Sequence, residues 1–314
     1  MIPSAGPSPQ AIPCVVCGSL DQAPFLRPAR SPGPVVRCRG CGLVFVSPRE
    51  DLRAIIDEGR PLAELERLRH SRDPRDLAGC WELDLLAAET PALRQARRVN
   101  HQAALRWIAA HRPPPGRLLD FGCGWGFFLE DAREAGWQVR GLEPLPGHGV
   151  HARGALGLDV VTDTLRPDSF PPESFDVVTA FQVFEHLPDP GAELTKLHGL
   201  LRPGGLVVIE VPNIATPLLR LLGGRHRHFV EDHLWFFSPR TLGRLLERHG
   251  FQPIATHFPT RRLPLERLLD AWAARYLPPA ALRGLRGLAG RAGLLERRLP
   301  VNLRDIVLRI GRKT

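Results

Sequence analysis

The chain of 314 residues lacks the features that would direct a protein into a membrane or out of the cell. It has no run approaching the ~18 consecutive apolar residues of a membrane-spanning helix. Its opening segment, residues 1–13, is rich in proline and serine and has neither the basic region nor the apolar core of a signal peptide. The sequence therefore predicts a cytoplasmic protein. Its length and its 43% of hydrophobic residues suit one main core with a small appended module.

Lysine is nearly absent, because Lys196 and Lys313 are the only two in the chain. The net charge of +9 is therefore carried by arginine. Residues 261–314 hold 13 basic and 4 acidic residues, so of the totals of 42 and 33 there remain 29 of each sign in residues 1–260. Together with abundant proline, glycine and alanine, this pattern indicates a GC-rich genome more than selection for phosphate binding. The charge alone does not indicate a nucleic-acid partner.

Four of the six cysteines form two C-x-x-C-G turns separated by 20 residues. Each turn presents two thiolates, and two such turns supply the four ligands of a tetrahedral Zn²⁺ site with no open coordination position. The spacing predicts a structural zinc ribbon over residues 1–48. A pair of disulfides is the alternative, against which stands the lack of an export signal. The predicted ligands are Cys14, Cys17, Cys38 and Cys41.

The chain is organised around a glycine-rich turn between a short apolar strand, residues 117–120, and a helix that begins near Phe127. Its three glycines are Gly122, Gly124 and Gly126. Glycine allows positive φ and lets a ligand approach the bare backbone. The spacing is G-x-G-x-G, whereas the dinucleotide fingerprint is G-x-G-x-x-G. Asp120, two residues before the first glycine, would repel a pyrophosphate but could hold a cationic amino group.

Further strands follow this turn, several of them ending in a polar residue. Glu143 stands about 20 residues beyond the turn, where an acidic residue binds ribose hydroxyls in βαβ nucleotide sites. Asp163 ends the third strand, and Gln182 follows the fourth. The predicted strands are residues 138–142, 160–163, 175–181, 206–213, 251–258 and 305–310.

This series closely resembles the class I S-adenosylmethionine-dependent methyltransferases, in particular a small-molecule group with a Glu-His-Leu motif after the fourth strand. The resemblance covers residues 97–258 and 306–312. It implies an α/β fold with a Rossmann-like, seven-stranded, mostly parallel sheet whose last strand is antiparallel. It also implies that S-adenosylmethionine binds at Asp120, Gly122, Cys123, Gly124, Gly126, Glu143, Asp163 and Gln182.

Glu185 and His186 form the Glu-His pair of this motif. A histidine beside a carboxylate can act as a general base, although the pair could equally do no more than shape the loop. Resemblance to ribbon-bearing sugar C-methyltransferases implies that the pair is catalytic. In the related quinone-precursor O-methyltransferases the motif reads Glu-x-x-Glu-His and is associated with a divalent metal. Here Gln182 occupies the first position, which weakens the metal interpretation.

Residues 225–238 alternate histidine, acidic and aromatic residues. We interpret them as a polar lid, with His233 as the alternate base and Trp235 near the substrate. An irregularly spaced metal cluster is the other interpretation. Ser238 is predicted to cap a helix over residues 239–249.

The connection before the last strand, residues 260–302, is predicted to be a helical insertion, because Leu265, Leu268, Leu269 and Trp272 share one helical face. Its basic amphipathic part, residues 262–300, could contact a membrane or a lipid-linked substrate. It could also be a helical cap or a dimer contact. The domain prediction is a ribbon over residues 1–48, a helical linker or lid over 49–93 and the methyltransferase domain over 94–314.

The predicted reaction is methyl transfer from S-adenosylmethionine to a small-molecule, glycan or sugar-linked acceptor, at carbon or oxygen. A nucleic-acid methyltransferase is one alternative, but the chain has no Asn/Asp-Pro-Pro-Tyr motif for a flipped base. A non-catalytic scaffold that retains the fold is another, against which stand the intact glycine turn and the Glu-His pair. The sequence does not determine the oligomeric state.

Overall fold

The computed structural model describes residues 11–49, 91–270 and 277–314. The predicted linker or lid over residues 49–93 lies largely outside these residues, and so does Trp272 of the predicted helical face. Within them, no helix is both long and apolar enough to cross a membrane.

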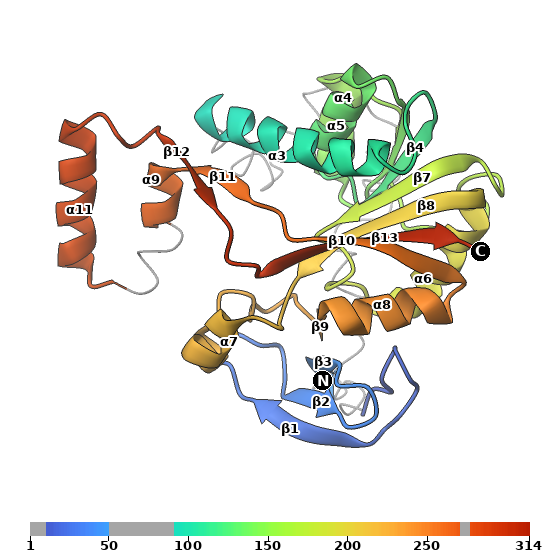
Figure 1. Cartoon of the computed structure of the whole chain (residues 1–314), viewed down its shortest axis with the longest axis horizontal. Helices are drawn as coiled ribbons and strands as arrows, with labels where there is room; N and C mark the ends of the chain where they lie inside the picture. The colour runs from blue at the N-terminus through green and yellow to red at the C-terminus, as the bar shows by residue number, and fades with distance from the viewer. Residues whose placement is uncertain (1–10, 50–90, 271–276) are drawn as a thin grey trace, which may run out of the picture.

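A seven-stranded sheet forms the centre of the molecule (Figure 1), in the order β10-β13-β8-β7-β4-β5-β6. The pairs among β8, β7, β4, β5 and β6 are parallel, whereas β13 runs antiparallel to both β8 and β10. This topology confirms the predicted fold class. The strands are β4 (Arg117–Phe121), β5 (Gln138–Leu142), β6 (Val160–Val161), β7 (Phe175–Phe181), β8 (Leu201–Pro212), β10 (Phe251–His257) and β13 (Ile306–Lys313).

Helices cover both faces of this sheet. On one face lie α3 (Pro91–Ala109), α4 (Phe127–Glu134) and α5 (Pro146–Gly154), and on the other lie α6 (Pro190–Leu200) and α8 (Pro239–Arg248). Successive strand residues serve opposite faces, as strand geometry requires: Leu118 packs with the α3–α4 side and Leu119 with the α6–α8 side. Ser238 caps α8 as predicted, because its hydroxyl accepts the N–H of Thr241 at 3.1 Å.

The cysteine-rich segment forms a small sheet with the order β1-β2-β3-β9. Its strands are β1 (Gln22–Leu26), β2 (Val35–Cys38), β3 (Val44–Val46) and β9 (Trp235–Phe236). The last strand comes from the segment between α8 and the short helices α7 (Pro217–Leu222) and η3 (Gly223–Arg225). The hydrophobic core beneath α6 and α8 includes Leu43 and Phe45 of the ribbon, so the ribbon and the central sheet share one core.

The insertion differs in part from the prediction, because it begins and ends as strands. β11 (Arg261–Pro264) pairs antiparallel with β12 (Arg298–Val301). Between them lie α9 (Leu265–Leu268) and α11 (Pro279–Arg291). The strand pair lies against α3, where the N–H of Arg262 donates to Asn100 Oδ1 at 3.0 Å, while α11 projects away from the molecule (Figure 1).

Candidate active site

The glycine turn connects β4 to α4 in a conformation that other residues rarely adopt. Gly122, Gly124 and Gly126 have φ values of 77°, 52° and 83°. A Cβ at Gly122 would lie 2.5 Å from Val183, and one at Gly126 would lie 2.6 Å from Leu158. No atom lies within 4 Å of a Cβ at Gly124. The turn is therefore packed at its two ends and open at its middle, where a ligand can approach.

Asp120 is buried at the end of β4, with 3% of its surface exposed. Its Oδ1 accepts a hydrogen bond from the Thr179 hydroxyl at 2.6 Å. Burial raises the pKa of this carboxyl to about 7, and the negative charge of Glu143 adds to the increase. A cationic group beside Asp120 would favour its ionised form, so this position fits an ammonium group.

Glu143, directly after β5, is bound to the same turn. Its Oε2 accepts the N–H of Gly124 at 2.7 Å, and its Oε1 accepts the N–H of Leu145 at 2.9 Å. Cys123 is buried, and burial raises the pKa of its thiol, which therefore serves as a small packing group. Asp163, after β6, accepts the N–H of Thr164 at 2.8 Å and pairs with Arg166.

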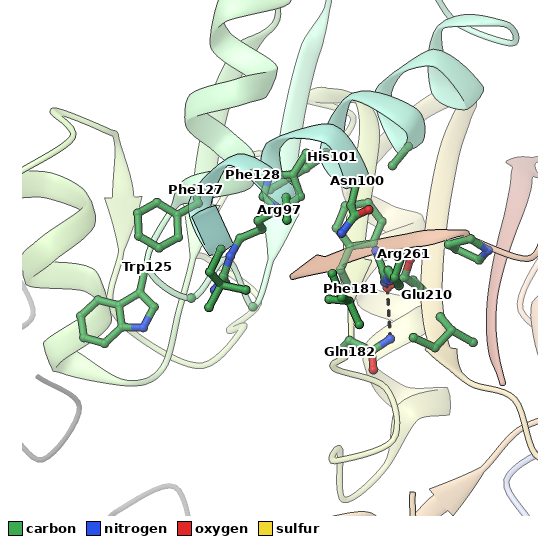
Figure 2. Close-up of a pocket in the computed structure, with 18 of the residues that line it drawn as sticks. Arg97, Asn100, His101, Trp125, Phe127, Phe128, Phe181, Gln182, Glu210 and Arg261 are labelled. Carbon is green, nitrogen blue, oxygen red and sulfur yellow. Dashed lines mark hydrogen bonds and ion pairs between the residues drawn. The ribbon is translucent and has the colours of Figure 1, made fainter. Parts of the chain in front are cut away.

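A cavity of about 480 Å³ opens at the glycine turn (Figure 2). Five of the residues predicted to bind the donor line it: Asp120, Gly122, Cys123, Gly124 and Gln182. The described part of its lining does not include Gly126, Glu143, Asp163, Glu185, His186 or His233. The glycine turn thus lines the cavity, whereas the predicted base His186 and the two acidic residues beyond the turn do not. The roles of those residues stay predictions.

The rest of the lining comes from elements that the sequence did not bring together. Polar side chains project from α3, from the end of β8 and from the insertion. Two of these positions had a sequence signal: Glu210 stands near the end of a parallel strand like Glu143 and Asp163, and Arg227 lies in the predicted polar lid over residues 225–238. The polar lining residues missed from sequence are Arg97, Asn100, His101, Glu210, Arg227, Arg261 and Asp305.

Glu210 and Arg261 form an ion pair at the wall of the cavity. Glu210 is 4% exposed and also accepts a hydrogen bond from the Gln182 amide at 3.2 Å, which Figure 2 shows. Because Arg261 begins β11, this pair ties the insertion to the end of β8. The insertion therefore forms part of the cavity wall.

His101 of α3 faces the cavity with its Nδ1 2.6 Å from Oδ2 of Asp131, a buried residue of α4. The carboxylate holds the proton on Nδ1, so the Nε2 lone pair is available to accept a proton. No local spacing marks this pair in the sequence, because its members are 30 residues apart.

Glu185, His186 and His233 form a second cluster after β7. One ligand-type atom from each residue lies within 4.8 Å of the others. His186 Nδ1 lies 3.0 Å from the carbonyl oxygen of Asp232, and His233 Nδ1 lies 2.9 Å from that of His228. Each Nδ1 therefore donates its hydrogen, which leaves both Nε2 lone pairs available. Such a group can accept a proton or hold a cation.

Glu185 is the most buried member of this cluster, with 1% of its surface exposed. Neither carboxylate oxygen has a hydrogen-bond partner among the described residues, and His186 Nε2 is 4.0 Å away. Burial raises the pKa of this carboxyl well above its ordinary range. The group is thus prepared to gain a proton or a positively charged neighbour.

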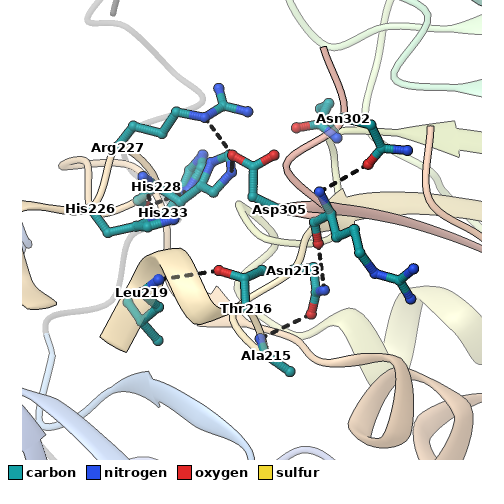
Figure 3. A network of polar contacts seen from close by, with 12 residues as sticks. Asn213, Ala215, Thr216, Leu219, His226, Arg227, His228, His233, Asn302 and Asp305 are labelled. Carbon is teal, nitrogen blue, oxygen red and sulfur yellow. Dashed lines mark hydrogen bonds and ion pairs between the residues drawn. The ribbon is translucent and has the colours of Figure 1, made fainter. Parts of the chain in front are cut away.

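A polar network connects this cluster to the cavity (Figure 3). Asp305, which lines the cavity, accepts a hydrogen bond from Arg227 Nε at 2.8 Å, and its Oδ2 lies 3.4 Å from His228 Nε2. Burial acts to raise the pKa of Asp305, but hydrogen bonds and positive charge from His228 and Arg227 hold it well below its usual range. The ring of His228 lies parallel to that of His233, with centroids 6.4 Å apart.

The interpretation of Trp235 as a substrate contact is wrong. Its ring stacks on Phe45 of the ribbon at 5.3 Å, and its indole N–H donates to the carbonyl of Leu187 at 2.7 Å. Only 2% of its surface is exposed, and it does not line the cavity. Its aromatic surface is used to join the ribbon to the core.

The four ribbon cysteines gather as the spacing predicted, with their sulfur atoms all within 4.8 Å of one another. Cys14 Sγ lies 3.4 Å from Cys41 Sγ, and Cys17 Sγ lies 3.4 Å from Cys38 Sγ. All four are free thiols. Burial raises the pKa of Cys41 to about 11, a cost that a bound cation would offset. The arrangement fits a four-thiolate zinc site.

Comparison with known proteins decides the family. A family model described as a methyltransferase domain matches residues 92–256, slightly more than half of the chain. The chain belongs to this methyltransferase family. Together with the strand order of the sheet, the match makes the protein a class I S-adenosylmethionine-dependent methyltransferase.

Several similar proteins carry the name ubiquinone biosynthesis O-methyltransferase. The protein from Burkholderia pseudomallei (strain 1710b) is 29% identical over 165 residues, which cover 48% of this methyltransferase and 71% of that protein. The Aeromonas salmonicida protein is 32% identical over 148 residues, covering 43% and 62%. The Ruegeria pomeroyi protein is 33% identical over 162 residues, covering 48% and 65%.

Among solved structures, a SAM-dependent methyltransferase from Archaeoglobus fulgidus is similar with a TM-score of 0.46 and 22% identity, covering 69% of this chain and 94% of that one.

Proposed function

We propose that this methyltransferase transfers a methyl group from S-adenosylmethionine to an oxygen atom of a small molecule bound in the cavity. The observation that carries the proposal is the cavity itself, which begins at the open middle of the glycine turn and continues to a polar wall about Glu210, Arg227 and Arg261. The names of the similar proteins support oxygen as the methylated atom. The alternatives are a sugar-linked acceptor and methylation at a carbon atom. Analysis of the methylated product would distinguish each of them from O-methylation of a small molecule.

The donor supplies an electrophilic methyl carbon on a positively charged sulfur. Asp120 would hold its ammonium group, since this buried carboxylate faces the cavity and has no cationic partner among the described residues. The backbone about Gly122, Gly124 and Gln182 would surround the methionine part. Glu143 would release its hydrogen bonds to the turn and accept hydrogen bonds from the ribose hydroxyls instead. Asp163 would bind the adenine amino group.

The acceptor would lie at the other end of the cavity, between α3 and the wall formed by β8 and the insertion. The protein contributes mainly by holding the acceptor oxygen in line with the methyl–sulfur bond. As the oxygen bonds to the methyl carbon, its proton must leave. We assign that proton to Nε2 of His186, whose Nδ1 hydrogen is fixed on the Asp232 carbonyl, with Glu185 stabilising the imidazolium. Because His186 lies outside the cavity lining, this role requires the acceptor to extend from the cavity towards the cluster after β7.

His233 is the weaker candidate for this role. Burial and the neighbouring His186 lower the pKa of His233 to about 4, so it binds a proton poorly near neutral pH. His101 is the rival within the cavity lining, because its Nε2 is also available and Asp131 supports it.

Alanine variants test these assignments. We expect His186→Ala to lower the methyl-transfer rate roughly 100-fold or more while the affinity for S-adenosylmethionine stays within about twofold of the wild type. Glu143→Ala should weaken donor binding instead. His101→Ala is the matched comparison: a rate loss there with His186→Ala unaffected would transfer the role of base to His101.

A further inference from the structure

The helix α11 of the insertion stands apart from the rest of the molecule (Figure 1). Within Pro279–Arg291 only Ala289 is buried. The helix is held by Arg286, near its middle, which pairs with Glu266 at 2.7 Å and with Asp270 at 2.6 Å. One side of α11 therefore faces α9, and its remaining surface contacts none of the sheet helices.

The outer side of α11 is apolar although it faces solvent. Ala281, Leu285, Leu288 and Ala292 follow one another at helical spacing and form one stripe. Leu285 is 45% exposed and Leu288 is 68% exposed. Leu277, just before the helix, is 39% exposed. Three of the five large hydrophobic residues exposed in the described chain thus lie together in the insertion.

The same region is strongly basic. Residues 277–301 contain five arginines and one acidic residue, Glu296. Arg286 is neutralised by Glu266 and Asp270. The other four arginines are exposed and make no ion pair with a described residue: Arg283, Arg291, Arg297 and Arg298. The helix Pro279–Arg291 itself contains no acidic residue.

We propose that this face of α11 docks the protein on the surface of an anionic lipid bilayer. Exposed leucines with flanking arginines are the composition of helices that lie in the membrane interface, with the apolar stripe among the acyl chains and the cations at the headgroups. A second copy of the chain fits less well, because two α11 faces would bring arginines together without an acid between them. A nucleic acid would satisfy the arginines but leave the leucines exposed.

Docking at α11 would also orient the cavity. β11 and β12 connect α11 to the sheet, and Arg261, Leu263 and Val301 of these strands line the cavity. The wall contributed by the insertion would therefore face the bilayer side. The proposal goes beyond methyl transfer and does not depend on the identity of the acceptor, because binding to lipid is measured without turnover.

Vesicle flotation of the full chain tests the proposal. We expect the protein to float with vesicles that contain phosphatidylglycerol and not with vesicles of phosphatidylcholine alone, and to release as salt screens the charges. Leu285→Ser combined with Leu288→Ser should weaken binding about tenfold or more. Arg283→Gln combined with Arg291→Gln should weaken it roughly 25-fold, about fivefold for each charge.

The matched control is Leu221→Ser on α7, since Leu221 is 81% exposed but lies outside the insertion. This variant should bind vesicles as the wild type does. Failure of the wild type to bind anionic vesicles at low salt would overturn the proposal, as would equal binding by the double-leucine variant. A concentration-dependent dimer that the leucine variants abolish would assign the face to a second copy. Calorimetric binding of S-adenosylmethionine, measured on the same samples, separates each of these results from a failure of the methyltransferase assignment.

Discussion

The ribbon and the insertion are two additions to one methyltransferase sheet, and they are attached in opposite ways. In the ribbon sheet, β3 pairs with β9 of the main domain, and Phe45 and Leu43 of the ribbon lie in the same core as α6 and α8. The insertion contacts the domain at its base, through β11 and the Arg261–Glu210 pair, while α11 remains exposed. The difference indicates that the ribbon supports the fold and that the tip of the insertion is available to a partner.

Loss of a predicted zinc ligand should have the largest effect, because the ribbon is part of the main core. Structural zinc sites contribute on the order of 10 kcal/mol to folding in small peptides. We expect Cys38→Ser to lower the free energy of unfolding by roughly 5 kcal/mol and to remove zinc from the protein. Metal analysis and denaturant unfolding measure the two effects.

The control for this variant is Cys123→Ser, which removes a buried thiol outside the ribbon and should leave the zinc content unchanged. If Cys38→Ser lost its zinc and the main domain kept its full stability, the ribbon would be an independent module. That result would contradict the claim that the ribbon supports the fold of the main domain.

Truncation of one large side chain in the ribbon sheet and one in the insertion compares what the two regions contribute to stability. Trp235→Ala removes a buried ring that stacks on Phe45 and should cost about 3–5 kcal/mol of unfolding free energy. Leu288→Ala removes an exposed side chain of α11 and should change stability by less than about 0.5 kcal/mol. Thermal and denaturant unfolding of the two variants test the pair, and similar costs at both sites would contradict the proposed difference.

A smaller effect is expected at the base of the insertion. Among the described residues, Arg261→Met leaves the side chain of the buried Glu210 with only the Gln182 amide as a partner, so we expect a loss of about 1–2 kcal/mol. Arg262→Met, at the next and more exposed position, should be neutral. Donor affinity, measured by calorimetry, should be unchanged in both variants, and a loss in Arg261→Met would mean that this wall belongs to the donor site.

Much of this architecture could be read from sequence because the signals are local. Val177 and Val178 lie in a largely apolar run bounded by the polar residues Ser174 and Gln182, and the predicted span of β7 matches the structure. The cysteine turns likewise fix their own geometry, since the N–H groups of Gly18 and Gly42 donate to the carbonyls of Cys14 and Cys38 at 2.7 and 2.9 Å.

What the sequence did not show depends on contacts between distant segments. β11 and β12 pair across the whole insertion, and β9 has only two residues, so neither has a periodic signal of its own. His101 and Asp131 meet only because α3 packs against α4. Trp235 was misassigned because an aromatic residue in a polar loop gives no indication of whether a ligand or another part of the chain will cover it.

Calorimetric titration of S-adenosylmethionine at two pH values tests the central claim, that the glycine turn and Asp120 form the donor site. Because burial raises the pKa of Asp120 to about 7 and the donor's ammonium requires the carboxylate, affinity should decrease as the pH falls from 8 to 6. We expect micromolar binding at pH 8, and a loss of at least about tenfold in Asp120→Asn. That variant should also make the donor-free protein more stable at pH 8 by on the order of 2 kcal/mol, since the wild-type carboxyl loses native stability as the pH rises from its unfolded pKa towards 7. Absence of binding by the folded, zinc-loaded wild type, or unchanged affinity in Asp120→Asn, would contradict the account.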